Sequence, residues 1–324
     1  MHTLTLIIRD VQHVTPLVRT FVLESADGSP LPAFEPGAHI KVRIPGQTDP
    51  RCYSLIGIDR DPAVFSHPSQ YRLGVRLDDA GTGGSRYMHS LQVGDTLYAD
   101  GPKNDFPLDA GVTTGQIILV AGGIGITPIA SMAAALVQAN RSFVLHYCGR
   151  TRTQLSLVDE LESLLPGQLH LHLDDEPSGL PDIQSLLDRY QPDDHLYVCG
   201  PQGMIDAMVA GARARQWPDS QVHVERFTTA AAQAGDHAFE VELRQSGMVL
   251  TVPADQTIFE AMEAAGCDPM VDCKRGECGV CLTTVIEGTP DHRDYCLSES
   301  EKAEGKVIHI CISRAKSARL VLDA

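Results

Sequence analysis

The sequence is poor in positive charge, and it contains no long uninterrupted apolar run. Its 324 residues include 26 Lys and Arg against 42 Asp and Glu, which gives a formal net charge of −16. Nucleic acids and anionic membranes repel such a chain at long range, so neither is expected as a partner. A membrane-spanning helix needs about 20 consecutive apolar residues, and none is expected here.

Several metal-site motifs are also missing. The histidines, among them His39, His89, His146 and His309, show neither an H-E-x-x-H motif nor a two-His, one-carboxylate spacing. A further metal site of that kind is therefore not expected. No Cys-His pairing of a Rieske centre occurs either, which argues against the chain being an oxygenase itself.

The start of the chain and its cysteine content bear on location. Residues 1–10 alternate polar and apolar side chains, as a strand does, and lack the apolar centre of a signal peptide. Nine cysteines, an odd number, suit a reducing compartment better than a disulfide framework. We therefore expect a cytoplasmic protein.

Four of the cysteines carry the strongest signal in the chain. Cys273, Cys278, Cys281 and Cys311 are spaced C-x4-C-x2-C and then x29-C, which is typical of the ligands of a plant-type [2Fe–2S] cluster. The glycines between the first three cysteines allow the backbone to wrap a cluster and to turn N–H groups toward its sulfurs. One-electron transfer is therefore the first functional hypothesis.

Other uses of these cysteines fit the spacing less well. A four-cysteine zinc site usually has two C-x2-C pairs, whereas this chain has one, and structural or disulfide-bonded thiols are the remaining alternative. Cys296 is a rival fourth ligand. Cys311 is preferred because the apolar alternation of residues 307–312 predicts a buried strand that would hold a ligand rigidly. The cysteines expected to be inert thiols are Cys52, Cys148, Cys267 and Cys296.

The pattern of apolar and polar residues changes at two places along the chain. Its first hundred residues form short apolar segments separated by Gly and Pro, which is typical of a small antiparallel barrel. From Gln116 apolar strands alternate with amphipathic helices, which predicts a doubly wound α/β domain with a parallel sheet. The expected barrel strands are 4–8, 17–23, 39–44, 52–58, 71–77 and 95–99. The expected α/β strands are 117–120, 143–147, 169–173 and 196–198, and the helices are 129–138, 155–165, 183–190 and 204–215.

A third region follows a segment that has little to bury. Residues 228–236 are mostly small and polar, so they form the best linker in the chain. After them the pattern returns to strands at 239–243 and 248–252, followed by a helix at 257–265 and then the cysteine loop.

A glycine-rich turn marks a candidate nucleotide site. The strand at 117–120 runs into Gly122, Gly123 and Gly125 and then into a helix, whose N-terminal N–H groups and dipole favour phosphate. Thr127 is expected to cap this helix, and the proline after it to occupy the first helical position. The run is not a G-x-G-x-x-G motif, so a tight structural turn is the alternative.

A second strand end resembles the first. Cys199, Gly200 and Pro201 follow an apolar strand and open another helix, and ligands of open α/β sheets collect at the carboxyl ends of strands. On spacing alone, Cys199 is better explained as a small buried apolar residue.

Two short motifs in the barrel suggest a flat, phosphorylated cofactor. One offers a guanidinium and a hydroxyl to a phosphate and an aromatic ring to a planar group. The other, a Gly-Gly-Ser run before a short helix, is a second candidate anion cradle. Taken singly, each motif is better explained by a solvated loop with an incidental arginine. The residues concerned are Arg51, Tyr53, Ser54, Gly83, Gly84 and Ser85.

The order of all these motifs resembles the phthalate dioxygenase reductase family, within the ferredoxin–NADP reductase superfamily, and most of all its vanillate O-demethylase reductases. The motifs are R-x-Y-S, G-G-S, G-G-x-G-x-T-P, C-G-P and C-x4-C-x2-C…C, and the resemblance covers essentially the whole chain. It implies an FMN-binding β-barrel domain at 1–107, an NAD-binding α/β domain at 108–227, the linker at 228–236 and a β-grasp [2Fe–2S] ferredoxin domain at 237–324.

The resemblance also implies roles for individual residues. Cys199 is expected near the nicotinamide ring, and Phe227, in a stretch resembling the family's E-x-F motif, near the flavin. The residues expected to bind FMN are Arg51, Tyr53, Ser54, Gly83, Gly84 and Ser85. Those expected around NADH are Gly122, Gly123, Gly125, Thr127, Gly200 and Pro201.

Such a chain is expected to be an NADH-dependent reductase that serves a Rieske-type aromatic oxygenase or demethylase. NADH gives up two electrons as a hydride and the cluster accepts one at a time, so FMN is expected between them. The resemblance favours NADH, while Arg150 and Arg152, after the second α/β strand, leave NADPH open. A monomer is expected.

Two rival functions remain open on the sequence. The same electron relay could serve another acceptor, such as a cytochrome P450. A rival from a different class is a non-enzymatic iron–sulfur redox sensor or electron carrier. A binding partner would then recognise the state of its cluster.

Overall fold

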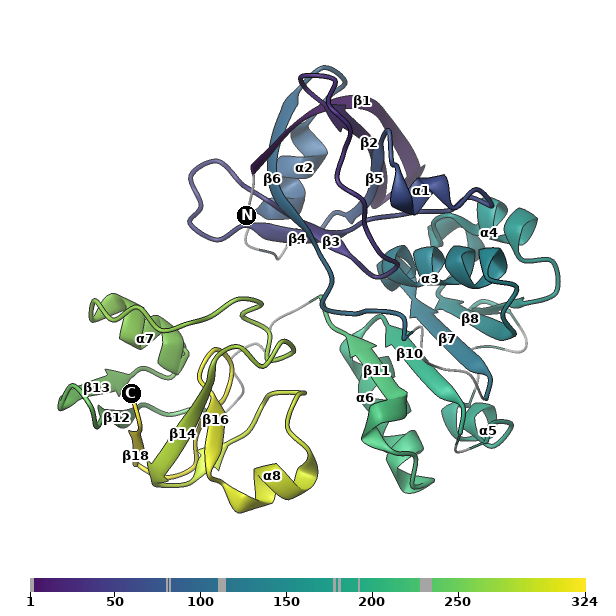
Figure 1. The fold of residues 1–324 in the computed structure, drawn as a ribbon. Coiled ribbons are helices and arrows are strands. Elements are labelled where there is room, and N and C mark those ends of the chain that lie inside the picture. The colour runs from purple at the N-terminus through teal and green to yellow at the C-terminus, as the bar shows by residue number, and fades with distance from the viewer. Residues whose placement is uncertain are drawn as a thin grey trace. The chain divides into compact units, whose positions relative to one another are not determined.

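The computed structural model describes residues 3–79, 81, 83–109, 115–176, 179, 182–191, 193–227 and 235–324. The chain divides into two compact units, Met1–Glu225 and Arg226–Ala324. Figure 1 shows the elements of both units with their labels. Most of the expected linker, residues 228–234, lies outside the described residues. The expected domain boundaries remain a prediction.

The first half of unit 1 is a curled antiparallel sheet of six strands in the order β4-β3-β6-β1-β2-β5. A bridge between Leu55 and Leu73, with a 2.8 Å hydrogen bond from the Ile56 N–H to the Arg72 carbonyl, joins its two edges. The sheet curls into a half-barrel, which confirms an antiparallel β-barrel type of domain. The strands are β1 Thr3–Thr15, β2 Val18–Ser25, β3 His39–Val42, β4 Arg51–Ser54, β5 Tyr71–Arg76 and β6 Thr96–Lys103, with short helices α1 Ala63–Ser66 and α2 Gly84–Ser90.

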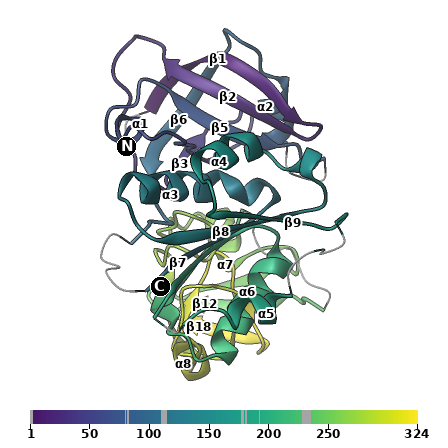
Figure 2. The same ribbon diagram turned by 90° about the vertical axis from the view of Figure 1, so that its right-hand side faces the viewer.

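The second half of unit 1 is a parallel sheet in the order β11-β10-β7-β8-β9, as a doubly wound domain requires. Helices α3 and α4 cover one face of this sheet, and α5 and α6 cover the other (Figure 2). The strands are β7 Ile117–Gly122, β8 Phe143–Gly149, β9 Leu169–Leu173, β10 His195–Cys199 and β11 Val222–Glu225, and the helices are α3 Ile126–Gln138, α4 Val158–Leu164, α5 Ile183–Leu187 and α6 Gln202–Ala214.

Strand β11 was not expected from the sequence. Its four residues alternate Val and polar side chains, and three of the four are only half-buried, so the segment is too short to stand out as a strand. It pairs with β10 from Leu196 to Cys199 and so extends the parallel sheet at that edge.

The barrel and the α/β domain share one hydrophobic core. The Ser131 hydroxyl, on α3, donates to the Leu55 carbonyl at 2.8 Å and accepts the Gly57 N–H at 2.9 Å. A Cβ added at Gly74, on β5, would lie 2.9 Å from Thr127 Cγ2. The two halves of unit 1 are therefore packed together as one body.

Unit 2 is a five-stranded mixed sheet, β13-β12-β18-β14-β16, with a core of its own. Strand β12 runs parallel to β18, and the other neighbours are antiparallel, which is the arrangement expected of a β-grasp domain. Helix α7 begins at a capping box made by Thr257 and Glu260, and its buried face packs on this core. The elements are β12 Phe239–Leu243, β13 Met248–Val252, α7 Ile258–Ala264, β14 Leu282–Glu287, β15 Pro290–Asp291, α8 Glu299–Glu304, β16 Val307–His309, β17 Arg314–Ala315 and β18 Arg319–Leu322.

The described part of the chain includes no helix that is both long enough and apolar enough to cross a bilayer.

Candidate functional site

The four cysteines of the predicted cluster motif meet in unit 2. Thiol–thiol hydrogen bonds link Cys273 to Cys278 and to Cys311, and link Cys281 to Cys311. The bonds from Cys278 and Cys311 lower the pKa of Cys273, and the bond from Cys311 lowers the pKa of Cys281 to about 7. The same bonds raise the pKa of Cys278 and Cys311, so the four thiols are close enough together to act on one another, as the ligands of one cluster must be.

Backbone N–H groups point at these sulfurs. The Arg275 N–H donates to Cys273 Sγ at 3.3 Å, and the Glu277 N–H also donates to this sulfur. The Val280 N–H donates to Cys278. Amide N–H groups therefore donate to at least two of the four thiols, and four thiols with amide donors are the chemistry that a [2Fe–2S] cluster takes, so the residues present fit that group.

The cysteine loop depends on one glycine for its shape. Gly276 has a φ of 73°, and a Cβ there would lie 2.8 Å from Ile312 Cγ2 and 3.0 Å from Asp294 Cα. Its carbonyl accepts the Tyr295 N–H at 2.9 Å. The loop therefore lies flat against the segment that follows β15, with no room for a side chain at Gly276.

The expected strand around Cys311 is wrong. Strand β16 ends at His309, and Cys311 lies in a turn closed by the Ser313 N–H, which donates to the His309 carbonyl at 3.0 Å. Cys311 is nevertheless only 5% exposed and belongs to the core of unit 2. Core packing, rather than a strand ladder, holds this thiol in place.

The rival ligand Cys296 is exposed. Its thiol donates to the Gly276 carbonyl at 3.1 Å rather than to another thiol. This arrangement favours Cys311 over Cys296 as the fourth thiol of the group.

A buried charged side chain next to the cysteines was not expected from the sequence. Glu277, between two cysteines of the motif, has a side chain only 7% exposed. Its carboxylate accepts the Arg226 N–H at 2.6 Å and lies 3.3 Å from Arg275 Nε. Burial raises the pKa of Glu277 to about 7, against the opposing effect of Arg275. An acidic residue between cluster cysteines was the available signal, but nothing in the sequence shows that it is buried.

A second buried polar group lies behind the loop. Asp294 is 1% exposed and lies 3.4 Å from His309 Nδ1 and 3.6 Å from His292 Nδ1. Burial alone would raise the pKa of Asp294, but hydrogen bonds from His309 and from the Leu297 N–H outweigh it and hold the pKa at about 2. The carboxylate is therefore ionised and holds the histidines behind the cysteine loop.

The two strand ends of the predicted nucleotide site lie side by side in unit 1. Strands β7 and β10 are parallel neighbours, with Ala121 opposite Cys199. A Cβ at Gly125 would lie 2.2 Å from the Cys199 carbonyl oxygen, and a Cβ at Gly122 would lie 2.5 Å from Pro201 Cδ. The glycines are therefore needed because the two turns touch.

Gly123 leaves an open place in this turn. It has a φ of 53°, and a Cβ there would meet no described atom within 4 Å. The Tyr147 hydroxyl lies 3.1 Å from the Gly123 carbonyl and fixes the turn from the side away from solvent. An open turn before the N-terminus of α3 fits the phosphates of a dinucleotide.

The predicted cap of α3 is wrong. The helix begins at Ile126 after a short 3-10 helix, Gly123–Gly125, and its N-cap residue is Gly125. Thr127 lies inside the first turn, where its hydroxyl donates to the Ile124 carbonyl at 3.1 Å. A proline is tolerated at position 128 because the first N–H groups of a helix have no partner within it. A role for Thr127 in binding NADH stays a prediction.

The two residues expected near the nicotinamide and the flavin differ in exposure. Cys199 is 1% exposed at the end of β10. Phe227 is 39% exposed and is the last described residue before the gap at 228–234. Their catalytic roles stay predictions.

The flavin motif of the barrel lies on β4. Arg51 and Tyr53 occupy alternate positions of this strand, and Ser54 follows opposite His39 of β3. Burial raises the pKa of Tyr53, so its phenol stays protonated. Ser54 is 4% exposed, and no described residue meets its hydroxyl in a hydrogen bond, which fits a hydroxyl reserved for a ligand.

The Gly-Gly-Ser loop adjoins this strand. A Cβ at Gly84 would lie 2.6 Å from Arg51 Cγ, so the two motifs, far apart in the sequence, are in contact. Gly83 has a φ of 97° and precedes α2. The Ser85 hydroxyl accepts the Asp78 N–H at 3.0 Å and so ties the loop together. A guanidinium beside a glycine turn fits the phosphate of a flavin nucleotide.

The structure also bears on the choice between NADH and NADPH. Arg152 makes a two-pronged contact with Glu162, at 2.8 and 2.7 Å, and lies 3.3 Å from Asp159. Its charge is therefore already matched by carboxylates, which disfavours a 2′-phosphate at this place. Arg150 is exposed.

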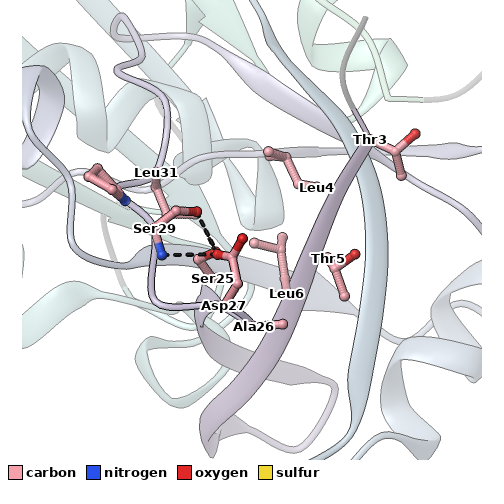
Figure 3. A pocket seen from close by; sticks show the side chains of 10 residues that line it. Thr3, Leu4, Thr5, Leu6, Ser25, Ala26, Asp27, Ser29 and Leu31 are labelled. Atoms are coloured by element: carbon pink, nitrogen blue, oxygen red, sulfur yellow. Dashed lines mark hydrogen bonds between the residues drawn. The ribbon is translucent and has the colours of Figure 1, made fainter.

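A separate pocket on the barrel contains none of the predicted site residues. It has a volume of about 410 Å³ and lies between β1 and the turn after β2 (Figure 3). Asp27 in this pocket accepts hydrogen bonds from the Ser29 N–H at 2.9 Å and from the hydroxyls of Ser25 and Ser29 at 2.6 Å. Its acidic group is already satisfied by the turn itself.

Comparison with known families matches two segments of the chain. Residues 119–210 match the oxidoreductase NAD-binding domain, and residues 241–316 match the 2Fe-2S iron-sulfur cluster binding domain. Vanillate O-demethylase oxidoreductase of Pseudomonas sp. (strain HR199 / DSM 7063) is 40% identical over 305 residues, which is 92% of each chain.

Two solved structures match nearly the whole chain. Phthalate dioxygenase reductase, described as a modular structure for electron transfer from pyridine nucleotides to [2Fe–2S], is 35% identical, with a TM-score of 0.71 over 99% of this chain and 98% of the reductase. An intact type IV self-sufficient cytochrome P450 monooxygenase is 34% identical, with a TM-score of 0.76 over 99% of this chain. The chain spans 41% of that larger protein.

These matches confirm the expected three-part fold, the enzyme class and the cofactor set of FMN, [2Fe–2S] cluster and NADH. They disfavour the non-enzymatic sensor, because the similar full-length chains are an oxidoreductase and a reductase. With a flavin-type barrel, a nicotinamide domain and a ferredoxin domain in the same order, this chain belongs to the phthalate dioxygenase reductase family.

Proposed function

We propose that the chain passes electrons from NADH to a separate Rieske-type oxygenase that hydroxylates or demethylates an aromatic compound. The observation that carries this proposal is similarity over nearly the full length to a vanillate O-demethylase oxidoreductase and to phthalate dioxygenase reductase. These 324 residues contain no Rieske ligand pattern, so the proposal places the oxygenase centre outside them.

Each cofactor is assigned to the residues that fit it. Together the cofactors convert the two-electron hydride of NADH into single electrons. Arg51 and the Gly-Gly-Ser loop hold the flavin phosphate, and the glycine turn before α3 holds the nucleotide pyrophosphate. Four thiols hold the cluster, within amide N–H donors that favour their ionised form. The assigned residues are Arg51, Tyr53, Ser54, Gly83, Gly84 and Ser85 for FMN, Gly122, Gly123, Gly125, Thr127, Gly200 and Pro201 for NADH, and Cys273, Cys278, Cys281 and Cys311 for the cluster.

Two further residues are proposed to act near the reacting rings. Cys199 lines the nicotinamide end of the site, where its carbonyl contacts Gly125. Phe227, in a stretch that resembles the family's E-x-F motif, is proposed to lie near the flavin. Neither transfers a proton, and their task is to hold the two rings in a geometry suited to hydride transfer.

The acceptor is tested by rapid mixing. The NADH-reduced protein is mixed with a Rieske oxygenase or with a cytochrome P450, and reoxidation of its flavin and cluster is followed. Fast reoxidation by the Rieske protein supports the proposal. Fast reoxidation by the P450 alone would overturn it.

A P450 acceptor is the second candidate, favoured by one observation. The self-sufficient P450 monooxygenase contains a region similar to 99% of this chain. An electron relay of this build therefore occurs in the same polypeptide as a P450, and the rapid-mixing experiment separates the two acceptors.

We also propose that the protein is a cytoplasmic monomer. Its free cysteines suit a reducing compartment. Light scattering after gel filtration tests the monomer, and a dimeric mass would refute it.

A further inference from the structure

Three charged side chains form a buried group beside the cysteine loop. Glu277, Arg226 and Arg275, here called the buried charge group, all belong to unit 2. Arg226 is 4% exposed and Arg275 is 7% exposed, and the Glu277 side chain is 7% exposed. Two guanidinium groups and one carboxylate are therefore held together away from solvent.

The contacts of this group fix it to the loop on two sides. The Glu277 carboxylate accepts the Arg226 N–H at 2.6 Å and lies 3.3 Å from Arg275 Nε. The Arg226 guanidinium lies 3.9 Å from the centre of the Tyr295 ring. The Tyr295 N–H in turn donates to the carbonyl of Gly276, the residue before Glu277. The positions of the charges are thus set by the fold.

Stability alone does not explain such an arrangement. Removing charged groups from water costs several kcal/mol per ion, and apolar side chains of similar volume often serve a fold as well or better. Glu277 directly precedes Cys278, and Arg275 lies two residues after Cys273 and donates its N–H to that sulfur. The Glu277 carboxylate also interacts electrostatically with Cys273, so at least this charge acts on the cysteine group.

We propose that the buried charge group sets the reduction potential of the [2Fe–2S] cluster, an inference that rests on the proposed cluster site. Reduction adds one electron to the cluster, with no bond made or broken, so the negative charge grows by one. The two guanidinium groups stabilise this added charge, and the Glu277 carboxylate opposes it. The carboxylate therefore limits how high the reduction potential of the cluster rises. The three residues of the buried charge group tune this potential and are not catalytic residues.

The decisive variant is Glu277→Gln, because it removes the charge and keeps an oxygen that can accept the Arg226 N–H. The cluster potential of the full-length protein is measured by dye-equilibrated titration in mildly alkaline buffer, followed by the EPR signal of the reduced cluster. We expect the reduction equilibrium constant to rise about tenfold, a shift of about 59 mV for one electron. Arg226→Gln removes a positive charge and is expected to shift the potential downward.

Matched controls separate local charge from general effects. Glu263→Gln removes the same charge from an exposed position on α7 and is expected to leave the potential unchanged. Arg275→Lys keeps the charge and is expected to shift the potential less than Arg275→Gln. High salt is expected to leave the shift in Glu277→Gln in place, because buried charges are screened less than exposed ones.

Two results would overturn the inference: equal potentials in Glu277→Gln and Glu263→Gln, or shifts of the same sign in Glu277→Gln and Arg226→Gln. If Glu277→Gln did not retain its cluster, Arg226→Gln would serve as the test. A downward shift of its potential would support the inference, and an unchanged potential would overturn it. Failure of the proposed cluster site looks different, because the wild-type protein would then lack the EPR signal or Cys278→Ala would keep it. A normal signal with unshifted potentials refutes only the tuning role.

Discussion

Gly125 packs against the backbone of Cys199 so closely that a Cβ at Gly125 would lie 2.2 Å from the Cys199 carbonyl oxygen. This contact joins the turn after β7 to the end of β10, the two strand ends assigned to the nicotinamide nucleotide. Any side chain at Gly125 must push the two turns apart.

Gly125→Ala is therefore expected to weaken NADH binding. Forcing an extra methyl group into a packed site typically costs about 1–3 kcal/mol, which corresponds to roughly a 10- to 100-fold loss of affinity. The KM for NADH in ferricyanide reduction measures the effect. Gly203→Ala is the control, because a Cβ there meets no described atom within 4 Å. Equal KM values in both variants would show that the contact does not matter for NADH.

Cys278→Ala is expected to affect electron transfer from the cluster but not electron transfer from the flavin. Ferricyanide accepts electrons from the flavin directly, so its reduction should persist, whereas cytochrome c reduction through the cluster should fall sharply. Steady-state rates with the two dyes measure this. Cys296→Ala is the matched control and should keep the cluster. Equal loss of both activities in Cys278→Ala, with flavin still bound, would contradict the order of transfer.

Arg51→Ala is expected to release FMN. A charge-assisted hydrogen bond contributes about 1.5–3 kcal/mol, so the affinity for FMN should fall roughly 10- to 100-fold. Quenching of flavin fluorescence on binding measures the dissociation constant. Arg43→Ala is the control, since Arg43 is exposed and pairs with Asp100 at 2.9 Å. Undiminished affinity in Arg51→Ala would refute a phosphate role for this guanidinium.

Glu162→Gln is expected to relax the preference for NADH. The substitution removes the carboxylate that now holds Arg152 at 2.7 Å, so the guanidinium becomes available to a 2′-phosphate. The ratio of kcat/KM for NADPH to that for NADH should rise severalfold, and Arg152→Ala in the same chain should cancel the gain. Glu160→Gln is the control, because Glu160 lies on the same helix and pairs with Arg72. A ratio that rises equally in both variants would disprove the role of Arg152.

Acid is expected to destabilise unit 1 through its buried histidines. Burial, with a smaller effect of His172 and His170, lowers the pKa of His146 to about 3, and burial lowers the pKa of His223 to about 4. The unfolded chain binds a proton at each near pH 6.5, whereas the folded chain does not. Stability is thus complete above about pH 6.5 and falls as the pH drops toward these lower values.

The urea concentration at half-unfolding, measured across this pH range, tests the effect. His146→Gln should flatten the pH dependence, because one of the proton-binding differences is gone. His67→Gln is the control, since His67 is exposed. A slope unchanged by His146→Gln would show that other groups control acid unfolding.

Patterns carried by neighbouring residues were read correctly from the sequence. Strands β12 and β13 were predicted with their observed bounds, because period-two alternation and flanking turns are local properties. The spacing of the cysteines likewise predicted a group of four thiols that the fold brings together. Arg51 and Gly84 were assigned to one cofactor, and the fold brings them into contact.

Features that depend on distant contacts were not predicted. The Glu277 carboxylate binds the N–H of Arg226, 51 residues away in the sequence, and no local pattern encodes that contact. The alternation around Cys311 predicted a strand, but the Ser313 N–H closes a turn on His309 instead. Thr127 is a residue type that commonly caps helices, but a 3-10 helix precedes it and α3 already begins at Ile126.

The shared core of the barrel and the nicotinamide domain limits how this polypeptide can be divided or recombined. Ser131 of α3 bonds to the backbone of Leu55 and Gly57, so a cut between the two halves would expose apolar surface on both fragments. The ferredoxin unit has a hydrophobic core of its own. A chimaera that exchanges only the segment after Glu225 is therefore expected to fold, whereas one that exchanges the barrel alone must also bring a compatible α3.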